Sequence, residues 1–260
     1  MSLRRVTLGD LHIADEPAFG RVGLYAQLKR HLRIANYPFR LLPADAEKWD
    51  DALLLNLCFW DTSLGGDVLV DTTLPADVVC HIAWHHLAHI RLTEGQLPLA
   101  AEALILGESI ASAFDLYLVG RLIDSAASSD FISTQVPAMA EVAESAGLEP
   151  EQFAGILDQV RANPEVAFES LRQLLFDTVL GLLAAPNADS AHQVLRVASQ
   201  HRFGCLLHHF EIANWLLHAR AAPQNASGPR AKEVDAQLRN QAIALDWLQL
   251  HWLDADLAAN

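Results

Sequence analysis

Residues 99–124 constrain the fold most, because they form a long apolar run with few charged side chains. The charged residues within the run, before its last position, are Glu102, Glu108, Asp115 and Arg121. A segment of this length and character is expected to be a central helix that is buried on several sides. A carboxylate on such a helix needs a partner, because an unpaired buried charge is costly.

Most of the remaining chain has helical periodicity interrupted by glycine and proline, which predicts a mainly α-helical fold. We expect residues 1–260 to form a single domain, with a loosely structured arm at residues 1–18. A β-branched run at residues 66–72 predicts at most a small β-sheet before the next helix. We expect helices at residues 19–36, 44–59, 75–93, 99–124, 136–146, 149–162, 166–185, 189–202, 205–220 and 231–258. A polar linker at residues 222–229 precedes the last of them.

Composition narrows the possible partners. The chain is 52% apolar and 19% charged, which is typical of a globular protein with a substantial core. Its net charge of -14 disfavours nucleic acid and anionic membrane surfaces, so we expect no nucleic acid and no membrane but a small-molecule or peptide substrate. The three cysteines are an odd number without CxxC spacing, which indicates a reducing compartment and predicts a cytoplasmic location.

Residues 80–89 hold four of the twelve histidines, at positions 81, 85, 86 and 89. In a helix His81, His85 and His89 form a stripe that drifts by about 40° per step around the axis. A pair spaced i, i+4 can present two imidazoles to one metal ion. His85 and His89, followed by Glu108 on the next helix, therefore predict a metal site, and residues 66–124 are its predicted core.

This pattern resembles a known family. Residues 85–89, His-His-Leu-Ala-His, and residues 99–111 are similar to the two active-site helices of gluzincin metallopeptidases, especially the minigluzincin-like proteases. The resemblance covers roughly residues 66–120 and implies a zincin-like two-helix core with His85, His89 and Glu108 as ligands of Zn(II). Those peptidases carry a catalytic glutamate where this chain has His86, so the resemblance makes His86 the candidate base. Imidazole is a poor substitute there, because its reach is shorter and it becomes cationic beside a divalent ion.

Two histidines and one carboxylate are also the ligand set of non-haem Fe(II) oxygenases, which need no protein base. This favours Fe(II) over Zn(II) and an oxygenase or hydroxylase acting on a small molecule or peptide. The ligand pattern is similar to that of HExxH-type 2-oxoglutarate-dependent hydroxylases, in which an arginine such as Arg91, Arg121 or Arg202 would bind the cosubstrate carboxylate. A zincin-like hydrolase that uses His86 and a catalytically inactive zincin-like binding protein stay open as alternatives.

Three further groups have open roles. His208, His209 and Glu211 form a second concentration of ligating side chains, which would supply a fourth ligand or a substrate contact if their helix crosses the site. A polar helix face that happens to contain histidines is the favoured interpretation. Asp115 lies seven residues after Glu108 on nearly the same face, so it would hold a histidine N–H or pair with an arginine. His81 is interpreted as a packed core histidine.

Overall fold

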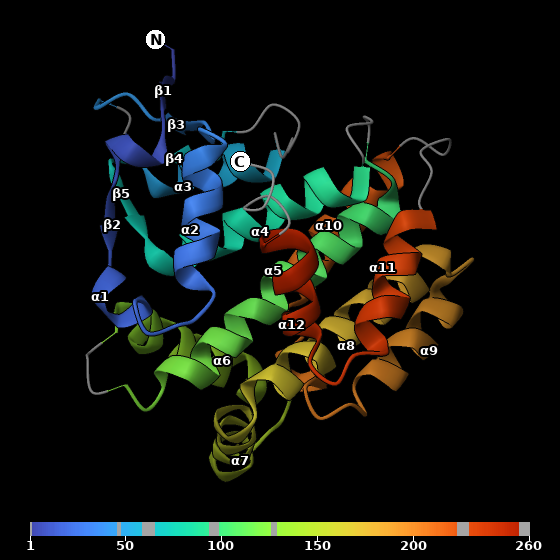
Figure 1. Ribbon diagram of the computed structural model, residues 1–260. Helices are drawn as coiled ribbons and strands as arrows, with labels where there is room; N and C mark the ends of the chain where they lie inside the picture. The colour runs from blue at the N-terminus through green and yellow to red at the C-terminus, as the bar shows by residue number, and fades with distance from the viewer. Residues whose placement is uncertain are drawn as a thin grey trace.

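A long buried helix, α5 (Ala101–Leu122), runs through the middle of the protein (Figure 1). The computed structural model describes residues 2–45, 48–58, 66–93, 99–125, 129–222 and 229–254. Of the 22 residues of α5, 17 are buried, which confirms the predicted central helix. By length and composition alone α5 would suit a membrane span, but its burial within the fold is that of a core helix.

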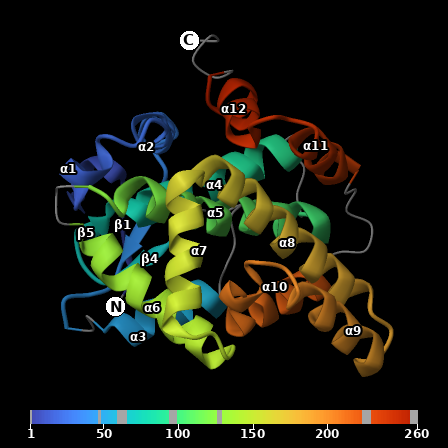
Figure 2. The same ribbon diagram turned by 90° about the horizontal axis from the view of Figure 1, so that it is seen from below.

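The other helices pack around α5. Its most extensive contacts are with α8 (Pro164–Ala184) and α4 (Ala76–Thr93), and α10 (His209–Ala221) packs against both α5 and α8 (Figure 2). The mainly α-helical fold is therefore confirmed. The remaining α-helices are α1 (Glu16–Phe19), α2 (Tyr25–Ile34), α3 (Trp49–Cys58), α6 (Asp130–Ser145), α7 (Pro150–Ala162), α9 (Ala188–Ala198), α11 (Pro229–Arg239) and α12 (Ala244–Leu248).

Short strands lie at one end of the helical body (Figure 1). One sheet has the order β1-β3-β4, with β1 (Arg4–Val6) antiparallel to β3 (Phe39–Leu41) and β3 parallel to β4 (Val68–Leu69). In the other sheet β2 (His12–Ala14) runs parallel to β5 (Thr73–Pro75), which leads directly into α4. The prediction of a small sheet before the histidine helix is confirmed.

The prediction of a loose N-terminal arm at residues 1–18 is wrong. This segment holds β1, β2, the 3-10 helix η1 (Leu8–Asp10) and the start of α1. Strands of three residues have no recognisable pattern of their own, because the partners that complete their hydrogen bonds lie far along the chain.

The C-terminal segment is also more divided than predicted. Instead of one helix over residues 231–258, α11 ends at Arg239, and α12 continues into a π-helical turn, η3 (Gln249–Leu253). After α11 the side-chain amides of Asn240 and Gln241 donate to the carbonyl oxygens of Ala236 and Gln237, which satisfies acceptors that a continuing helix would have used. Residues 255–258, and residues 223–228 of the predicted linker, lie outside the described ranges.

Candidate metal centre

Three side chains with metal-ligating atoms converge between α4 and α5. They are His81 and His85 of α4 and Glu108 of α5, and their ligand atoms all lie within 4.8 Å of one another. The ring centroids of His81 and His85 are 4.7 Å apart, and His85 Nε2 lies 3.7 Å from Glu108 Oε2. We call His81, His85 and Glu108 the trio. It contains two of the three ligands predicted from the sequence.

His81, not His89, completes the group. His81 lies beside Asp115 and His85 lies beside Glu108, so α4 and α5 pack against each other in antiparallel orientation. Beyond His85 the two helices come very close, because a Cβ added to Gly107 would lie 3.1 Å from the Cβ of Ala88. His89 does not line the cavity that adjoins the trio. The predicted i, i+4 spacing is therefore present, but one helical turn nearer the start of α4.

This shift also weakens the gluzincin resemblance. The histidine nearest to Glu108 in the trio is His85, with 22 residues between them, whereas the resemblance counts 18 from His89. The position that follows His81, where a peptidase would carry its glutamate, holds Ile82, which is buried and apolar.

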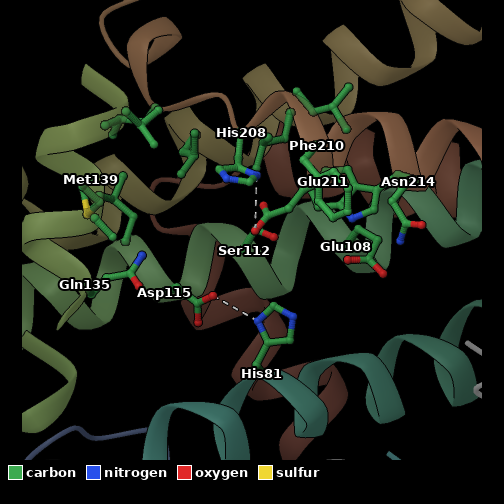
Figure 3. A pocket seen from close by; sticks show the side chains of 18 of the residues that line it. His81, Glu108, Ser112, Asp115, Gln135, Met139, His208, Phe210, Glu211 and Asn214 are labelled. Carbon is green, nitrogen blue, oxygen red and sulfur yellow. Dashed lines mark hydrogen bonds and ion pairs between the residues drawn. The ribbon is translucent and has the colours of Figure 1, made fainter. Parts of the chain in front are cut away.

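Asp115 positions the ring of His81. Its Oδ2 lies 3.0 Å from His81 Nδ1 (Figure 3), which confirms one of the two roles predicted for this carboxylate. A proton held on Nδ1 by a carboxylate leaves Nε2 with its lone pair free to bind a metal ion. In Figure 3 Glu108 lies on the other side of the His81 ring from Asp115.

Burial dominates the protonation of the trio. Burial, together with the charge of His81, lowers the pKa of His85 well below its usual value, so that its imidazole is neutral, as a metal ligand must be. Burial alone would lower the pKa of His81, but the neighbouring Asp115 carboxylate raises it to about 9. Burial raises the pKa of Glu108 to about 8. A divalent cation bound here would displace one proton from Glu108 and one from His81, and its charge would replace that of the imidazolium beside Glu108.

A cavity of about 570 Å³ adjoins the trio between α4, α5, α6, α8 and α10 (Figure 3). His81, His85 and Glu108 all contribute to its wall. The other polar side chains of the described lining are Asn56, Asp67, Ser112, Asp115, Gln135, Glu141, His208, Glu211 and Asn214.

α10, which carries Glu211 and is preceded by His208 at its N-cap, does cross the site, which was the condition for these residues to have a role there. His208 Nδ1 lies 4.0 Å from Glu211 Oε1, and both side chains line the cavity across from His81 (Figure 3). His209 is absent from the described lining. Sequence spacing could not link α10 to α4, because their proximity depends on how both helices pack on α5.

His86, the predicted catalytic base, does not line the cavity. Its ring packs edge-on against Tyr37, with centroids 5.3 Å apart. The physical reason is the helical turn, since adjacent residues point about 100° apart around the axis and His86 cannot share the direction of His85.

The arginines predicted to bind 2-oxoglutarate also lie elsewhere. Arg121 donates to the Tyr117 hydroxyl at 3.1 Å and pairs with Glu165, and Arg202 stacks on Phe203 with its guanidinium carbon 4.5 Å from the ring centroid. Arg91 donates to a backbone carbonyl of the C-terminal segment at 2.9 Å. None of the three lines the cavity. Arg121 is 13 residues from Glu108, or about 20 Å along the helix axis.

Asp67 is a cavity residue that the sequence did not reveal. Its Oδ2 accepts a hydrogen bond from the Tyr37 hydroxyl at 2.7 Å, and burial raises the pKa of its carboxyl group. It lies in the short segment before β4, where no spacing relates it to the histidines of α4.

No protein-family model, curated protein or solved structure matches this chain. The structure shows a mainly helical fold and a His-His-Glu group at metal-binding distances. The gluzincin resemblance stays a prediction that rests on the residues alone.

Proposed function

We propose that the protein is a metal-dependent enzyme that holds one divalent ion with His81, His85 and Glu108 and acts on a small molecule in the adjoining cavity. The observation that carries this proposal is the convergence of three ligand atoms within 4.8 Å of one another at the wall of a cavity of about 570 Å³. That volume is in the range typical of small-molecule sites, roughly 300–1,000 Å³.

The ligand set favours a non-haem Fe(II) oxidoreductase. Two imidazoles and one carboxylate leave coordination positions open for oxygen and substrate, and Fe(II) bound to such a set supplies O₂ activation. The chain itself would orient His81 through Asp115, keep His85 neutral through burial, and hold the substrate beside the ion. We include a cytoplasmic location in the proposal, since a ferrous ion stays reduced there.

Hydrolysis is the second candidate, and it needs a group that accepts a proton from water. Neither Ile82 nor His86 can fill this role from its observed position. Glu211 faces the cavity from α10, so a zinc hydrolase would have to use this carboxylate rather than His86. The arginine positions give no support to 2-oxoglutarate as a cosubstrate, and we leave it out of the proposal.

Paired histidine variants test the site. Metal-free protein titrated with Co(II), whose visible spectrum reports coordination, should bind one equivalent. His81→Ala should weaken binding by more than about 100-fold, because loss of an outer-shell partner alone typically costs about 10- to 100-fold. His89→Ala is the matched control on the same helix and should bind as the wild type does. An equal loss of Co(II) affinity in both variants, or no Co(II) binding by the wild type, would refute the proposed metal site.

The reaction class needs a separate measurement. Protein loaded anaerobically with Fe(II) should consume O₂ when air is admitted, whereas the Zn(II)-loaded protein should not. Peptide or ester cleavage by the zinc form, abolished in Glu211→Gln, would instead establish the hydrolase.

A further inference from the structure

We propose that the cavity takes a small amphipathic amine, with its ammonium group toward Glu211 and its apolar body against α6, α8 and α10. This inference deepens the proposed function, on which it rests in so far as the bound amine would be the substrate of the metal centre. Three features of the cavity favour such a ligand, namely the charge of its wall, its apolar side chains and the aromatic rings near Glu211.

The charged side chains of the described cavity wall are acidic, apart from its histidines. The wall contains five carboxylates, from Asp67, Glu108, Asp115, Glu141 and Glu211, and no lysine or arginine. The segments outside the described ranges also contain no lysine or arginine in their sequence. A positive charge in this cavity must therefore come from histidine, from a metal ion or from the ligand.

Most of these carboxylates already have a partner. Asp115 is bonded to His81, Asp67 accepts from a tyrosine hydroxyl, and Glu108 would be neutralised by the metal ion. Two carboxylates remain. Glu141 has no ion pair with another described residue, and the closest described partner of Glu211 is His208, at 4.0 Å and with side-chain exposures of 48% for His208 and 55% for Glu211. Glu211 is the better placed of the two to receive an ammonium group, because aromatic side chains of its own helix line the cavity beside it.

The cavity wall also has apolar side chains, which suit a hydrocarbon body. Met139 and Val142 of α6, Leu171 and Leu175 of α8, and Ile212 of α10 all line the cavity. Burial of these surfaces by a ligand contributes roughly 25 cal/mol per Å² of apolar area.

Two aromatic residues lie next to Glu211 on the same helix. Trp215, one turn further along α10, is buried, and Phe210 is 61% exposed, and both line the cavity. An aromatic face attracts an ammonium group through its quadrupole. The wall thus combines one anionic anchor, aromatic rings and an apolar surface, which together favour a cationic head on an apolar body.

Three probe molecules with the same hexyl hydrocarbon chain and different head groups separate the contribution of charge from that of apolar contact. We would measure binding of n-hexylammonium, 1-hexanol and hexanoate by calorimetry, to the Zn(II)-loaded and to the metal-free protein. The ammonium should bind at least about 10-fold more tightly than the alcohol, since a charge-assisted contact is roughly twice as strong as a neutral one. Hexanoate should bind most weakly, because Glu141 and Glu211 repel it. Tighter binding of hexanoate than of hexylammonium by the metal-free protein would overturn the proposal; in the Zn(II)-loaded protein a carboxylate could also bind the metal ion.

Glu211→Gln keeps the shape of the side chain and removes its charge. It should reduce the preference for hexylammonium over hexanol to about 2-fold or less, while hexanol binding stays as in the wild type. The matched control is Glu233→Gln, an exposed glutamate of α11 outside the cavity, which should retain the full preference. An unchanged preference in Glu211→Gln would refute the role of this residue.

Measurements on the Zn(II)-loaded and the metal-free protein distinguish failure of the amine site from failure of the metal site. If the ammonium preference is present but no metal binds at the trio, the amine site stands and the proposed function fails. If the metal binds at the trio but the ammonium preference is absent, the proposed function stands and the amine inference fails.

Discussion

Two clusters of ionisable side chains, each around a buried residue, differ in how their charges are balanced. In the first, Arg172 of α8 is fully buried, and its guanidinium donates to both carboxylate oxygens of Glu169 at 2.7 Å and to Asp235 of α11 at 2.8 Å. In the second, the trio, a buried carboxylate and two imidazoles face a cavity with an acidic wall.

The two clusters differ in whether the chain supplies the counter-charges. The Arg172 cluster contains its own counter-charges, so it joins α8 to α11 and needs nothing from solution. The described cavity wall around the trio contains no lysine or arginine, and the one positive charge of the trio, that of protonated His81, is already paired with Asp115. A buried group whose counter-charge is missing from the chain marks a place where an ion or ligand is expected.

The largest predicted effect concerns the balanced cluster. Arg172→Ala should lower the free energy of unfolding by about 3–5 kcal/mol, because it leaves Glu169 and Asp235 as partly buried carboxylates without their cation. Urea denaturation measures this change. Arg161→Ala is the control, since Arg161 also contacts two carboxylates but has a 48% exposed side chain, and it should cost less than about 1 kcal/mol. Similar costs for both variants would remove the distinction between the buried and the exposed cluster.

A smaller effect is expected beside the trio. Asp115→Asn keeps the size of the side chain but removes the carboxylate that holds His81 Nδ1. Metal affinity should fall by about 10- to 100-fold. The free energy of unfolding of the metal-free protein should change little above about pH 9, where His81 is neutral with or without Asp115, and should fall at neutral pH, where Asp115 stabilises the imidazolium. Parallel Co(II) titration, and urea denaturation above about pH 9, distinguish this positioning role from a general loss of structure, which would lower both quantities.

The smallest predicted effect is at Glu108, where substitution should raise the free energy of unfolding rather than lower it as at Arg172. The folded pKa of Glu108 is raised by burial from an ordinary 4.5 to about 8, so the folded state favours the protonated acid. Below pH 4.5 Glu108 is protonated in both the folded and the unfolded state, so the free energy of unfolding of the metal-free protein is then not reduced by this group. As the pH rises from 4.5 toward 8, the unfolded state loses this proton first and the free energy of unfolding falls.

Glu108→Gln should remove that part of the pH dependence and stabilise the metal-free protein at pH 7 by on the order of 1 kcal/mol, although it abolishes tight metal binding. Unfolding curves at several pH values, collected with a chelator present, measure this difference. A variant that is less stable than the wild type at pH 7 would indicate that Glu108 has a structural partner and belongs with the Arg172 cluster.

The elements that sequence predicted best are those with a long local pattern. The apolar run of α5 and the four-residue period of the histidines in α4 depend on nearby residues, and both helices were found. Which i, i+4 pair meets Glu108 depends instead on how closely α4 and α5 approach at Ala88 and Gly107. That is a property of packing between helices, so the prediction chose His89 where the structure has His81.

The remaining differences have the same origin. Glu211 reaches the cavity only after α10 has packed on α5 and α8, and Asp235 reaches Arg172, which lies 63 residues before it, only after α11 has packed on α8. The strands of the N-terminal segment likewise exist because of partners elsewhere in the sequence. Local periodicity carries no information about these contacts.

The most direct test of the central claim is an anomalous difference map from crystals of the Fe(II)-loaded protein, collected at the iron absorption edge. The account predicts one peak between His81, His85 and Glu108, with Asp115 still bonded to His81. A peak shared by His85, His89 and Glu108, or no peak near these residues, would contradict it.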